Sequence, residues 1–314
     1  MKSALPFGLL TVLGPTASGK TRLAVALAER FSGEIISADS RQVFRGMDIG
    51  SGKDLHEYGQ IPHHLIDILE AGEEFSVFAF QRLFRDAYDD IRSRGRMPIL
   101  CGGSGMYLDA ALRGYQLEEV PPDHQLRAEL ALKSDQELCG ILATLRPELH
   151  NKTDLLERQR TIRAIEIARY DALGQKIEQQ FPDLHPLVIG IRLERDEMRH
   201  RITERLRTRL ENGLIEEVQE LHQRGISWER LDYYGLEYRY VGAFLRGDLN
   251  RNDMFQKLNS AIHDFAKRQG NWFRKMERHG VCIHWVDGAA DPLAEALEII
   301  ATGGVDESGG LLGR

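Results

Sequence analysis

A phosphate-binding motif lies near the start of the chain. The stretch GPTASGKT matches the pattern G-x-x-x-x-G-K-[ST] without a gap. The backbone N–H groups of such a loop form a nest for anions, and the following helix adds the positive end of its dipole. Lys20 supplies a mobile charge for the outer phosphate, and the Thr21 hydroxyl can ligate a Mg²⁺ ion. The motif therefore predicts a phosphate site formed by Gly14, Pro15, Thr16, Ala17, Ser18, Gly19, Lys20 and Thr21.

Two carboxylates stand where they could serve this site. Asp39 ends the apolar run 34–38, which places it at the carboxyl edge of a parallel sheet, where ligands of open α/β sheets bind. It can act there as a base or a metal ligand, or it can cap a following helix. Asp67 stands inside the apolar segment HHLIDIL, which we interpret as a strand. It is either a metal ligand or a hydrogen-bonded structural carboxylate.

Arginines recur at helical spacing in two segments. Arg160 and Arg163 are three residues apart, and three arginines follow one another at steps of four in 201–209. Such rows usually form solvent-exposed faces, but an enzyme that handles phosphates needs arginine or metal to stabilise developing negative charge. In 265–279, basic residues alternate with aromatic ones. This pattern fits single-stranded nucleic acid, and it fits equally an amphipathic helix whose aromatic residues are buried.

The elements that must position these residues alternate between strands and helices. The pattern predicts strands at 9–13, 34–39, 98–101, 186–193 and 281–286, and helices at 20–31, 76–91 and 253–276. Another helix begins near Met198, and Gly213 weakens or ends it. Strands that alternate with helices indicate a parallel sheet with helices on both faces. We therefore predict an α/β fold, a P-loop NTPase-like parallel sheet flanked by helices, with an inserted all-helical subdomain.

The domain boundaries follow from a change in composition after Gly114. We assign 1–114 to the first part of the P-loop core, 115–182 to the helical insertion and 183–290 to the second part of the core. The segment 291–314 ends in the glycine-rich stretch TGGVDESGGLLGR, and we expect this C-terminal tail to be largely disordered.

Composition limits the class of protein. The chain has 314 residues, 42% of them hydrophobic, and a net charge of −7. That charge argues against broad, non-specific binding of nucleic acid, although a local basic groove remains compatible with it. An odd number of cysteines, three, makes a disulfide framework improbable. No apolar run approaches the ~20 residues of a membrane span. We expect a cytoplasmic monomer with no membrane partner.

Several segments together resemble the tRNA dimethylallyltransferases, also called tRNA isopentenyltransferases. They occur in the family order and cover most of 8–287. The segments are GPTASGKT (14–21), GEIISADSRQVFRGMDIGSGK (33–53), PHHLIDIL (62–69), PILCGGSGMY (98–107), RQRTIRAIEI (158–167), GLIEEV (213–218) and AKRQGNWFR (266–274). The first two of these segments are the most specific to the family.

The resemblance implies a prenyl transfer rather than use of ATP. The loop would hold the diphosphate of dimethylallyl diphosphate, and the allyl group would pass to N6 of the adenine 3′ of the anticodon in tRNA, with release of diphosphate. Asp39 would be the general base, Thr16 and Ser104 would border the reacting centre, and Arg205 would support the diphosphate. The residues implied in tRNA binding are Asp39, Ser40, Arg41, Gln42, Gln159, Arg160, Thr161, Ile162, Arg163 and Gly235.

The chain departs from the family pattern at some positions. Phe44 replaces a tyrosine, and Ser104 replaces a threonine but keeps the hydroxyl. In YYGLEYRY, Leu236 and Glu237 replace an aromatic and a basic residue of a stretch that contacts tRNA. Because of this altered segment, one alternative is a prenyl transferase that acts on a free adenine nucleotide. A P-loop kinase, with Asp39 or Asp67 as magnesium ligand, is the other.

Overall fold

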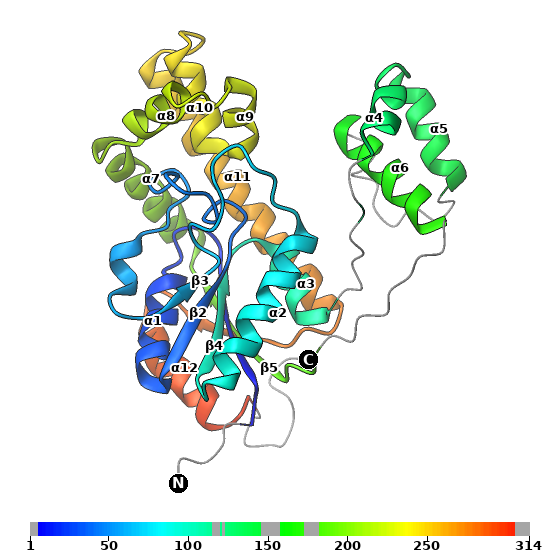
Figure 1. The fold of residues 1–314 in the computed structure, drawn as a ribbon. Coiled ribbons are helices and arrows are strands. Elements are labelled where there is room, and N and C mark those ends of the chain that lie inside the picture. Colours follow the sequence, from blue (N-terminus) through cyan, green and yellow to red (C-terminus); the bar gives the residue numbers. More distant parts are fainter. Residues whose placement is uncertain (1–5, 115–119, 121–122, 146–157, 173–181, 305–314) are drawn as a thin grey trace. The chain divides into compact units, whose positions relative to one another are not determined.

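The structure is a computed structural model of the chain, and it describes residues 6–114, 120, 123–145, 158–172 and 182–304. The chain divides into two compact units, one built from 1–114 with 182–314 and one from 115–181 (Figure 1). We describe each unit by itself.

A six-stranded parallel sheet forms the centre of the larger unit. Its strands are β1 (Leu9–Leu13), β2 (Gly33–Ala38), β3 (His63–His64), β4 (Met97–Gly102), β5 (Pro186–Arg192) and β6 (Ile283–Asp287), in the order β3-β2-β4-β1-β5-β6. Gly102 at the end of β4 is in register with Ala38 of β2 and Leu13 of β1. Three neighbouring strands therefore end at the same level, and the loops that follow them meet at one edge. The predicted P-loop NTPase-like sheet is confirmed.

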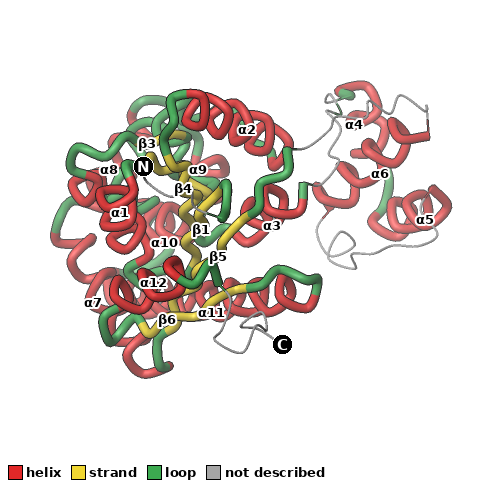
Figure 2. Tube along the Cα trace, turned by 90° about the horizontal axis from the view of Figure 1, so that it is seen from below, coloured by secondary structure: helices red, strands yellow, loops and turns green. Residues whose placement is uncertain are grey.

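Helices cover both faces of the sheet. Figure 2 shows α1 (Lys20–Phe31) and α12 (Pro292–Ala301) on one side, and α2 (Val77–Ser93) and α3 (Gly105–Arg113) on the other. The strands β1, β2 and β4 are buried along their whole length, as expected for parallel strands between two helical layers. Ser76 caps α2 by accepting a hydrogen bond from the Ala79 N–H, which agrees with the sequence prediction.

The prediction of a largely disordered tail at 291–314 is wrong for its first part. Residues 292–301 form α12, which Asp291 caps by accepting a hydrogen bond from the Ala294 N–H. Ala296 and Ile300 are buried in the same core cluster as β1 and β5. The apolar residues in PLAEALEII recur at helical spacing, and this periodicity outweighs the glycine-rich sequence that follows. Residues 305–314 lie outside the described part of the chain.

A layer of helices follows β5 and has a core of its own. It comprises α7 (Arg195–Glu211), α8 (Leu214–Gln223), α9 (Trp228–Tyr234), α10 (Leu236–Leu245) and α11 (Arg251–Arg278). Gly213, with φ of 100°, separates α7 from α8, so the chain turns here as the glycine suggested. Val43, Phe44 and Met47 from the loop after β2 are buried in this core. The layer therefore holds the loop that leaves the sheet edge.

The smaller unit is helical in its described residues. Its helices are α4 (His124–Ala131), α5 (Asp135–Leu145) and α6 (Arg158–Ala172), and leucine and isoleucine side chains such as Leu138 and Ile165 form the core between them. Glu166, 3% exposed, accepts hydrogen bonds from Arg127, Arg163 and the Asp123 N–H. Its buried charge is thus compensated. None of the helices that the structure describes has the length and apolar character needed to cross a bilayer.

Candidate active site at the carboxyl edge of the sheet

The predicted phosphate loop connects β1 to α1 in a shape that only certain residues allow. Gly19 has φ of 88° and Ala17 has φ of 62°, both in the left-handed region. A Cβ atom at Gly14 would lie 2.5 Å from the Ser18 Oγ, so the tight turn requires glycine there. A Cβ atom at Gly19 would meet nothing within 4 Å. The N-terminus of α1 therefore opens to space that an anion could occupy.

A buried glutamine ties this loop to the neighbouring strand. The Thr16 N–H donates to Gln269 Oε1 at 2.8 Å, and Gln269 Nε2 donates to the Gly103 carbonyl at 2.9 Å. Gln269 belongs to α11 and is 7% exposed. We did not predict this residue. The signal was available, since Gln269 is a polar residue on the otherwise apolar stripe that contains Ala266 and Phe273.

The loops after β2 and β4 bring Asp39 and Ser104 to the same edge as Thr16. The Ser104 N–H donates to the Ala38 carbonyl at 3.3 Å, and the Ser104 Oγ accepts from the Ser40 N–H at 3.4 Å. Asp39 Oδ1 accepts from the Arg41 N–H at 2.8 Å, which closes a turn and not a helix. Asp39 is half-buried. The carboxylate therefore sits at the sheet edge, where the sequence predicted it.

Arg205 reaches the loop from α7. Its Nη1 donates a hydrogen bond to the Thr16 Oγ1 at 3.4 Å, and its Nη2 forms an ion pair with Asp54. Arg209, one turn later, pairs with Glu237 at 3.3 Å. A Cβ atom at Gly52 would come within 2.7 Å of the Arg205 Nη2 and closer still to Arg209. Gly52 also has φ of 65°, in the left-handed region, so glycine is favoured at this position of the loop 48–54.

The charges at this edge act on Lys20. Burial lowers the pKa of Lys20 below its usual 10.5, and the positive charge of Arg205 adds to this effect, while Asp39 and Asp54 oppose it. The four charged groups are therefore close enough to influence one another. A phosphate group bound beside Lys20 would favour the charged ammonium.

Two other predicted residues have structural roles. Gln42 accepts from the Ser37 hydroxyl at 2.8 Å and donates to the Gly52 carbonyl at 3.1 Å, so it braces the loop. Asp67, which we predicted within a strand, lies outside β3 and has φ of 55°. Its carboxylate pairs with Lys53, a fully buried cation. Asp67 is therefore the structural carboxylate of the two alternatives, because it compensates a buried charge.

The residues predicted to bind tRNA on α6 divide into two groups. Thr161 and Ile162 are 2% and 4% exposed, so their side chains face the core of the smaller unit. Arg163 donates to the Val120 carbonyl at 2.8 Å and pairs with Glu166. Gln159 and Arg160 are exposed. The exposed pair has the accessibility that a nucleic-acid contact requires, and the buried pair does not.

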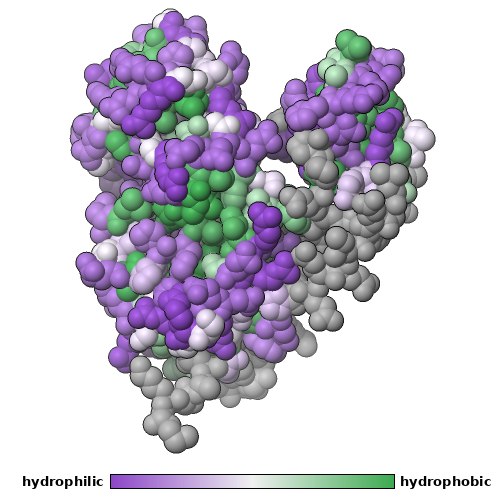
Figure 3. Space-filling view, in the orientation of Figure 1, coloured by the Kyte–Doolittle hydropathy of each residue, from purple (hydrophilic) through white to green (hydrophobic). Residues whose placement is uncertain are grey.

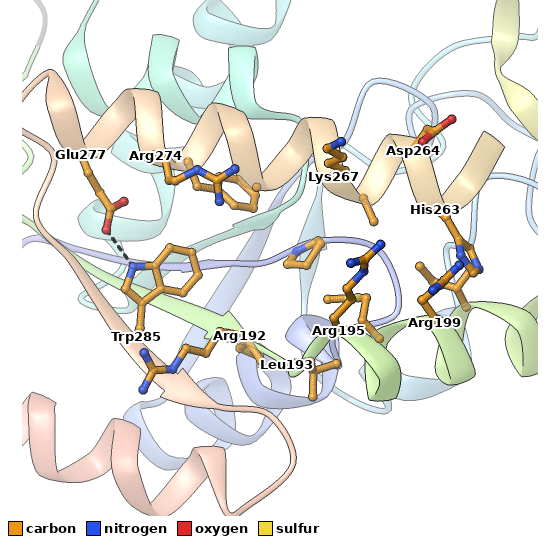
Figure 4. Close-up of a pocket in the computed structure, with 17 residues that line it drawn as sticks. Arg192, Leu193, Arg195, Arg199, His263, Asp264, Lys267, Arg274, Glu277 and Trp285 are labelled. Carbon is orange, nitrogen blue, oxygen red and sulfur yellow. Dashed lines mark hydrogen bonds between the residues drawn. The ribbon is translucent and has the colours of Figure 1, made fainter. Parts of the chain in front are cut away.

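A cavity of about 770 Å³ is lined by Pro15 of the phosphate loop and by residues at the carboxyl end of β5. Figure 4 shows Arg192, Arg195, Arg199 and Lys267 around it. Arg274 also lines the cavity, together with the acidic residues Asp264 and Glu277, so basic residues outnumber acidic ones in this lining. Sequence reasoning did not single out the two arginines nearest β5, because they belong to no periodic row. Their charge adds a positive potential beside the phosphate loop.

The sequence predicted a Mg²⁺ ion at Thr21, and the side chains at the sheet edge show which oxygen atoms could bind it. Among the described residues there is no group of three or more histidine, cysteine or acidic side chains that could hold a metal ion. Mg²⁺ needs no such group, since it usually takes one or two protein ligands together with phosphate oxygens and water. The Thr21 hydroxyl, in the first turn of α1, and the Asp39 carboxylate are oxygen donors of the required kind.

Comparison with known proteins places the chain in a family. The model of the IPP transferase family matches residues 42–276, and the isopentenyl transferase model matches residues 7–61. The chain is 66% identical over 301 residues to tRNA dimethylallyltransferase 2 of Trichlorobacter lovleyi, covering 96% of this chain and 99% of that protein. It is 68% identical over 300 residues to the protein of the same name from Pelobacter propionicus, covering 96% of each.

Comparison with solved structures supports the same family. The tRNA isopentenylpyrophosphate transferase of Bacillus halodurans is 34% identical, with a TM-score of 0.69 over 94% of each chain. A eukaryotic dimethylallyltransferase acting on tRNA shares the fold, with a TM-score of 0.78, 22% identity and coverage of 93% of this chain and 77% of that one. This chain belongs to the IPP transferase family.

Proposed function

We propose that the protein is a tRNA dimethylallyltransferase. It transfers the dimethylallyl group of dimethylallyl diphosphate to N6 of the adenine 3′ of the anticodon and releases diphosphate. The observation that carries the proposal is the meeting of the phosphate loop, Asp39, Ser104 and Arg205 at one edge of the sheet. Relatives at 66% and 68% identity that carry this name support the choice of substrates.

The first task of the site is to hold a leaving diphosphate. Exocyclic adenine nitrogen is a poor nucleophile, so the C1–O bond of the allyl diphosphate must be weakened by stabilising the charge that develops on the leaving group. The N–H groups of the loop, Lys20 and Arg205 supply that stabilisation. Arg205 is already oriented by Asp54 and Thr16, so little reorganisation is needed when substrate binds.

The second task is to orient the amine and accept its proton. N6 forms a bond to C1, the C1–O bond breaks, and diphosphate leaves with the electron pair. The proton lost by N6 passes to the carboxylate of Asp39. Ser40 follows Asp39 in the chain and donates its N–H to the Ser104 Oγ. Gln42 braces the same loop through Ser37 and Gly52. The target base must leave its stack to reach this edge.

Three further expectations belong to the proposal. Mg²⁺ at Thr21 would neutralise charge on the diphosphate when it is bound. The tRNA anticodon stem-loop would contact Ser40, Arg41, Gln159, Arg160 and the segment at Gly235. We expect the protein to act as a cytoplasmic monomer.

The test is to incubate the protein with dimethylallyl diphosphate, Mg²⁺ and an unmodified tRNA transcript, and to analyse the nucleosides by mass spectrometry. We expect adenosine to gain one dimethylallyl group. A transcript with guanine in place of the target adenine is the control and should remain unmodified. Efficient transfer to AMP without transfer to tRNA would refute the proposal, and so would hydrolysis of ATP as the main reaction.

A further inference from the structure

An exposed aromatic ring contacts two arginines beside the proposed acceptor site. Tyr233, at the end of α9, is 60% exposed. The guanidinium of Arg41 lies over its ring at 5.1 Å from the centroid, and that of Arg230 lies at 5.4 Å. No part of the chemistry proposed above uses this ring.

The ring is close to the residues that would receive the target adenine. Arg41 Nη2 donates to the Tyr233 carbonyl at 3.0 Å, while the backbone N–H of the same Arg41 donates to Asp39 Oδ1. One residue thus connects the exposed ring directly to the proposed catalytic carboxylate. Figure 3 shows apolar side chains gathered on one face of the larger unit, between the helical layer and the sheet.

The backbone under the ring is fixed. Tyr234 is completely buried, and its ring packs on Phe44 at 4.8 Å between centroids. Gly235 follows with φ of 141° and is the N-cap residue of α10. Because the next residue is anchored in the core and Arg41 binds its carbonyl, Tyr233 presents its ring from a rigid position. A preorganised aromatic surface loses little entropy when a ligand stacks on it.

The same segment departs from the family pattern at Leu236 and Glu237. The carboxylate of Glu237 does not face the solvent: its side chain is 18% exposed and pairs with Arg209. Positions 236 and 237 therefore do not offer an aromatic and a basic residue to RNA. Two positions before Gly235 have these residue types, since Tyr233 is aromatic and exposed and Arg230 is basic and partly exposed.

We propose that Tyr233, with Arg41 and Arg230, forms a stacking platform for an unpaired RNA base next to the target adenine. This inference rests on the proposed function, because it names a contact of the same acceptor. When the adenine leaves its stack, a neighbouring base loses a stacking partner, and the tyrosine ring replaces that partner. Backbone carbonyls hold the two guanidinium groups, since Arg41 donates to Tyr233 and Arg230 donates to Gly72 and Glu73. Their positive charges add attraction for the RNA backbone beside the ring. Stacking on aromatic residues tolerates any base, so the platform contributes affinity more than sequence specificity.

The test compares three substitutions at one exposed position. Tyr233→Phe keeps the ring, Tyr233→Leu keeps apolar bulk without the ring, and Tyr233→Ala removes both. Affinity for an anticodon stem-loop RNA is measured by fluorescence anisotropy, and dimethylallyl diphosphate binding is measured as a control. We expect the Phe variant to bind RNA like the wild type, and the Leu and Ala variants to bind about 5- to 100-fold more weakly. Diphosphate binding should not change in any of them.

Two further measurements separate stacking on the ring from attraction by the neighbouring charges. A 2-aminopurine next to the target adenine should be quenched by the wild type and the Phe variant, and less by the Leu variant. Arg230→Gln should lower the salt dependence of binding by about one phosphate contact, a slope change of ~0.7–0.9, whereas Tyr233→Leu should not alter the slope.

The outcomes are distinguishable from a failure of the proposed function. Unchanged RNA affinity in the Leu and Ala variants, with normal transfer by the wild type, would overturn the platform alone. Equal losses in the Phe and Ala variants would assign the effect to the hydroxyl and would also overturn it. A wild type that neither binds nor modifies the RNA would overturn the proposed function instead.

Discussion

The buried amide of Gln269 should determine whether the phosphate loop keeps its shape. Replacing it with leucine preserves the approximate volume and removes both of its hydrogen bonds, leaving the Thr16 N–H and the Gly103 carbonyl without partners. An unsatisfied buried polar group costs about 1–3 kcal/mol. Gln269→Leu should therefore lower the free energy of unfolding by about 2–5 kcal/mol. Because Thr16 is in the loop, the affinity for diphosphate should fall as well.

A matched control exists in the same unit. Gln81 is equally buried, at 7% exposed, and its Nε2 donates to the Ala110 carbonyl at 2.9 Å. Gln81→Leu should also cost stability, by about 1–3 kcal/mol, but it should leave the affinity for dimethylallyl diphosphate unchanged. Urea unfolding and isothermal titration calorimetry with the diphosphate measure the two effects separately. The contrast between the variants tests the anchoring of the loop, and not merely the burial of an amide.

A glutamate at the same position adds a test by pH. In Gln269→Glu, one oxygen can still accept from the Thr16 N–H, but an ionised carboxylate would face the Gly103 carbonyl. Only the protonated acid can donate to that carbonyl, so the folded state should raise the pKa of this group above its unfolded value of ~4.3. The contribution to stability is then present below that value and is lost as the pH rises through the raised pKa. A Gln269→Leu variant with unchanged stability and unchanged diphosphate affinity would refute the reasoning.

Three further predictions follow from the charged residues. Asp39→Asn should keep diphosphate binding and lose about 10²–10⁴-fold in transfer rate, as for a general base; near-normal turnover would remove Asp39 from the mechanism. Lys20→Ala should weaken dimethylallyl diphosphate far more than RNA in direct binding assays, and equal losses would contradict the layout. Glu34 is 1% exposed, and the Arg94 guanidinium lowers the pKa of Glu34 from 4.5 to about 2. The stabilisation, up to about 3 kcal/mol, should be present above pH ~4.5 and lost as the pH falls towards 2; unfolding of Glu34→Gln should show a smaller dependence on pH in that range.

Most of the fold could be predicted because parallel sheets leave a clear pattern. Buried strands such as 9–13 and 98–101 are continuous apolar runs, and the helices between them have apolar residues at helical spacing. The segment around Asp67 was misassigned for a definable reason. It is a short apolar run, which resembles a buried strand. In the structure, Asp67 has a left-handed backbone conformation and its carboxylate pairs with the buried Lys53.

The site could be predicted where a motif specifies backbone geometry, and it was missed where contacts come from distant segments. The phosphate loop and Asp39 follow from local sequence, since strand ends determine their place. Gln269 lies 253 residues from its partner Thr16, and no local pattern links the two. The roles of Thr161 and Ile162 followed from resemblance alone, and burial of both side chains assigns them to the packing of α6.

The pairing of Glu237 with Arg209 explains how this chain can differ from the family pattern without disturbing the site. Arg209 would otherwise be a nearly buried cation, since its side chain is 12% exposed. Burial and the neighbouring Arg205 both lower its pKa, and the carboxylate of Glu237 opposes this. A basic residue at position 237 would place a third positive charge against two arginines in a buried space, at a cost of several kcal/mol. Glu237 thus compensates the charge of Arg209 together with Asp54, and a basic contact to RNA near Gly235 has to come from another residue, such as the partly exposed Arg230 or the exposed Arg239.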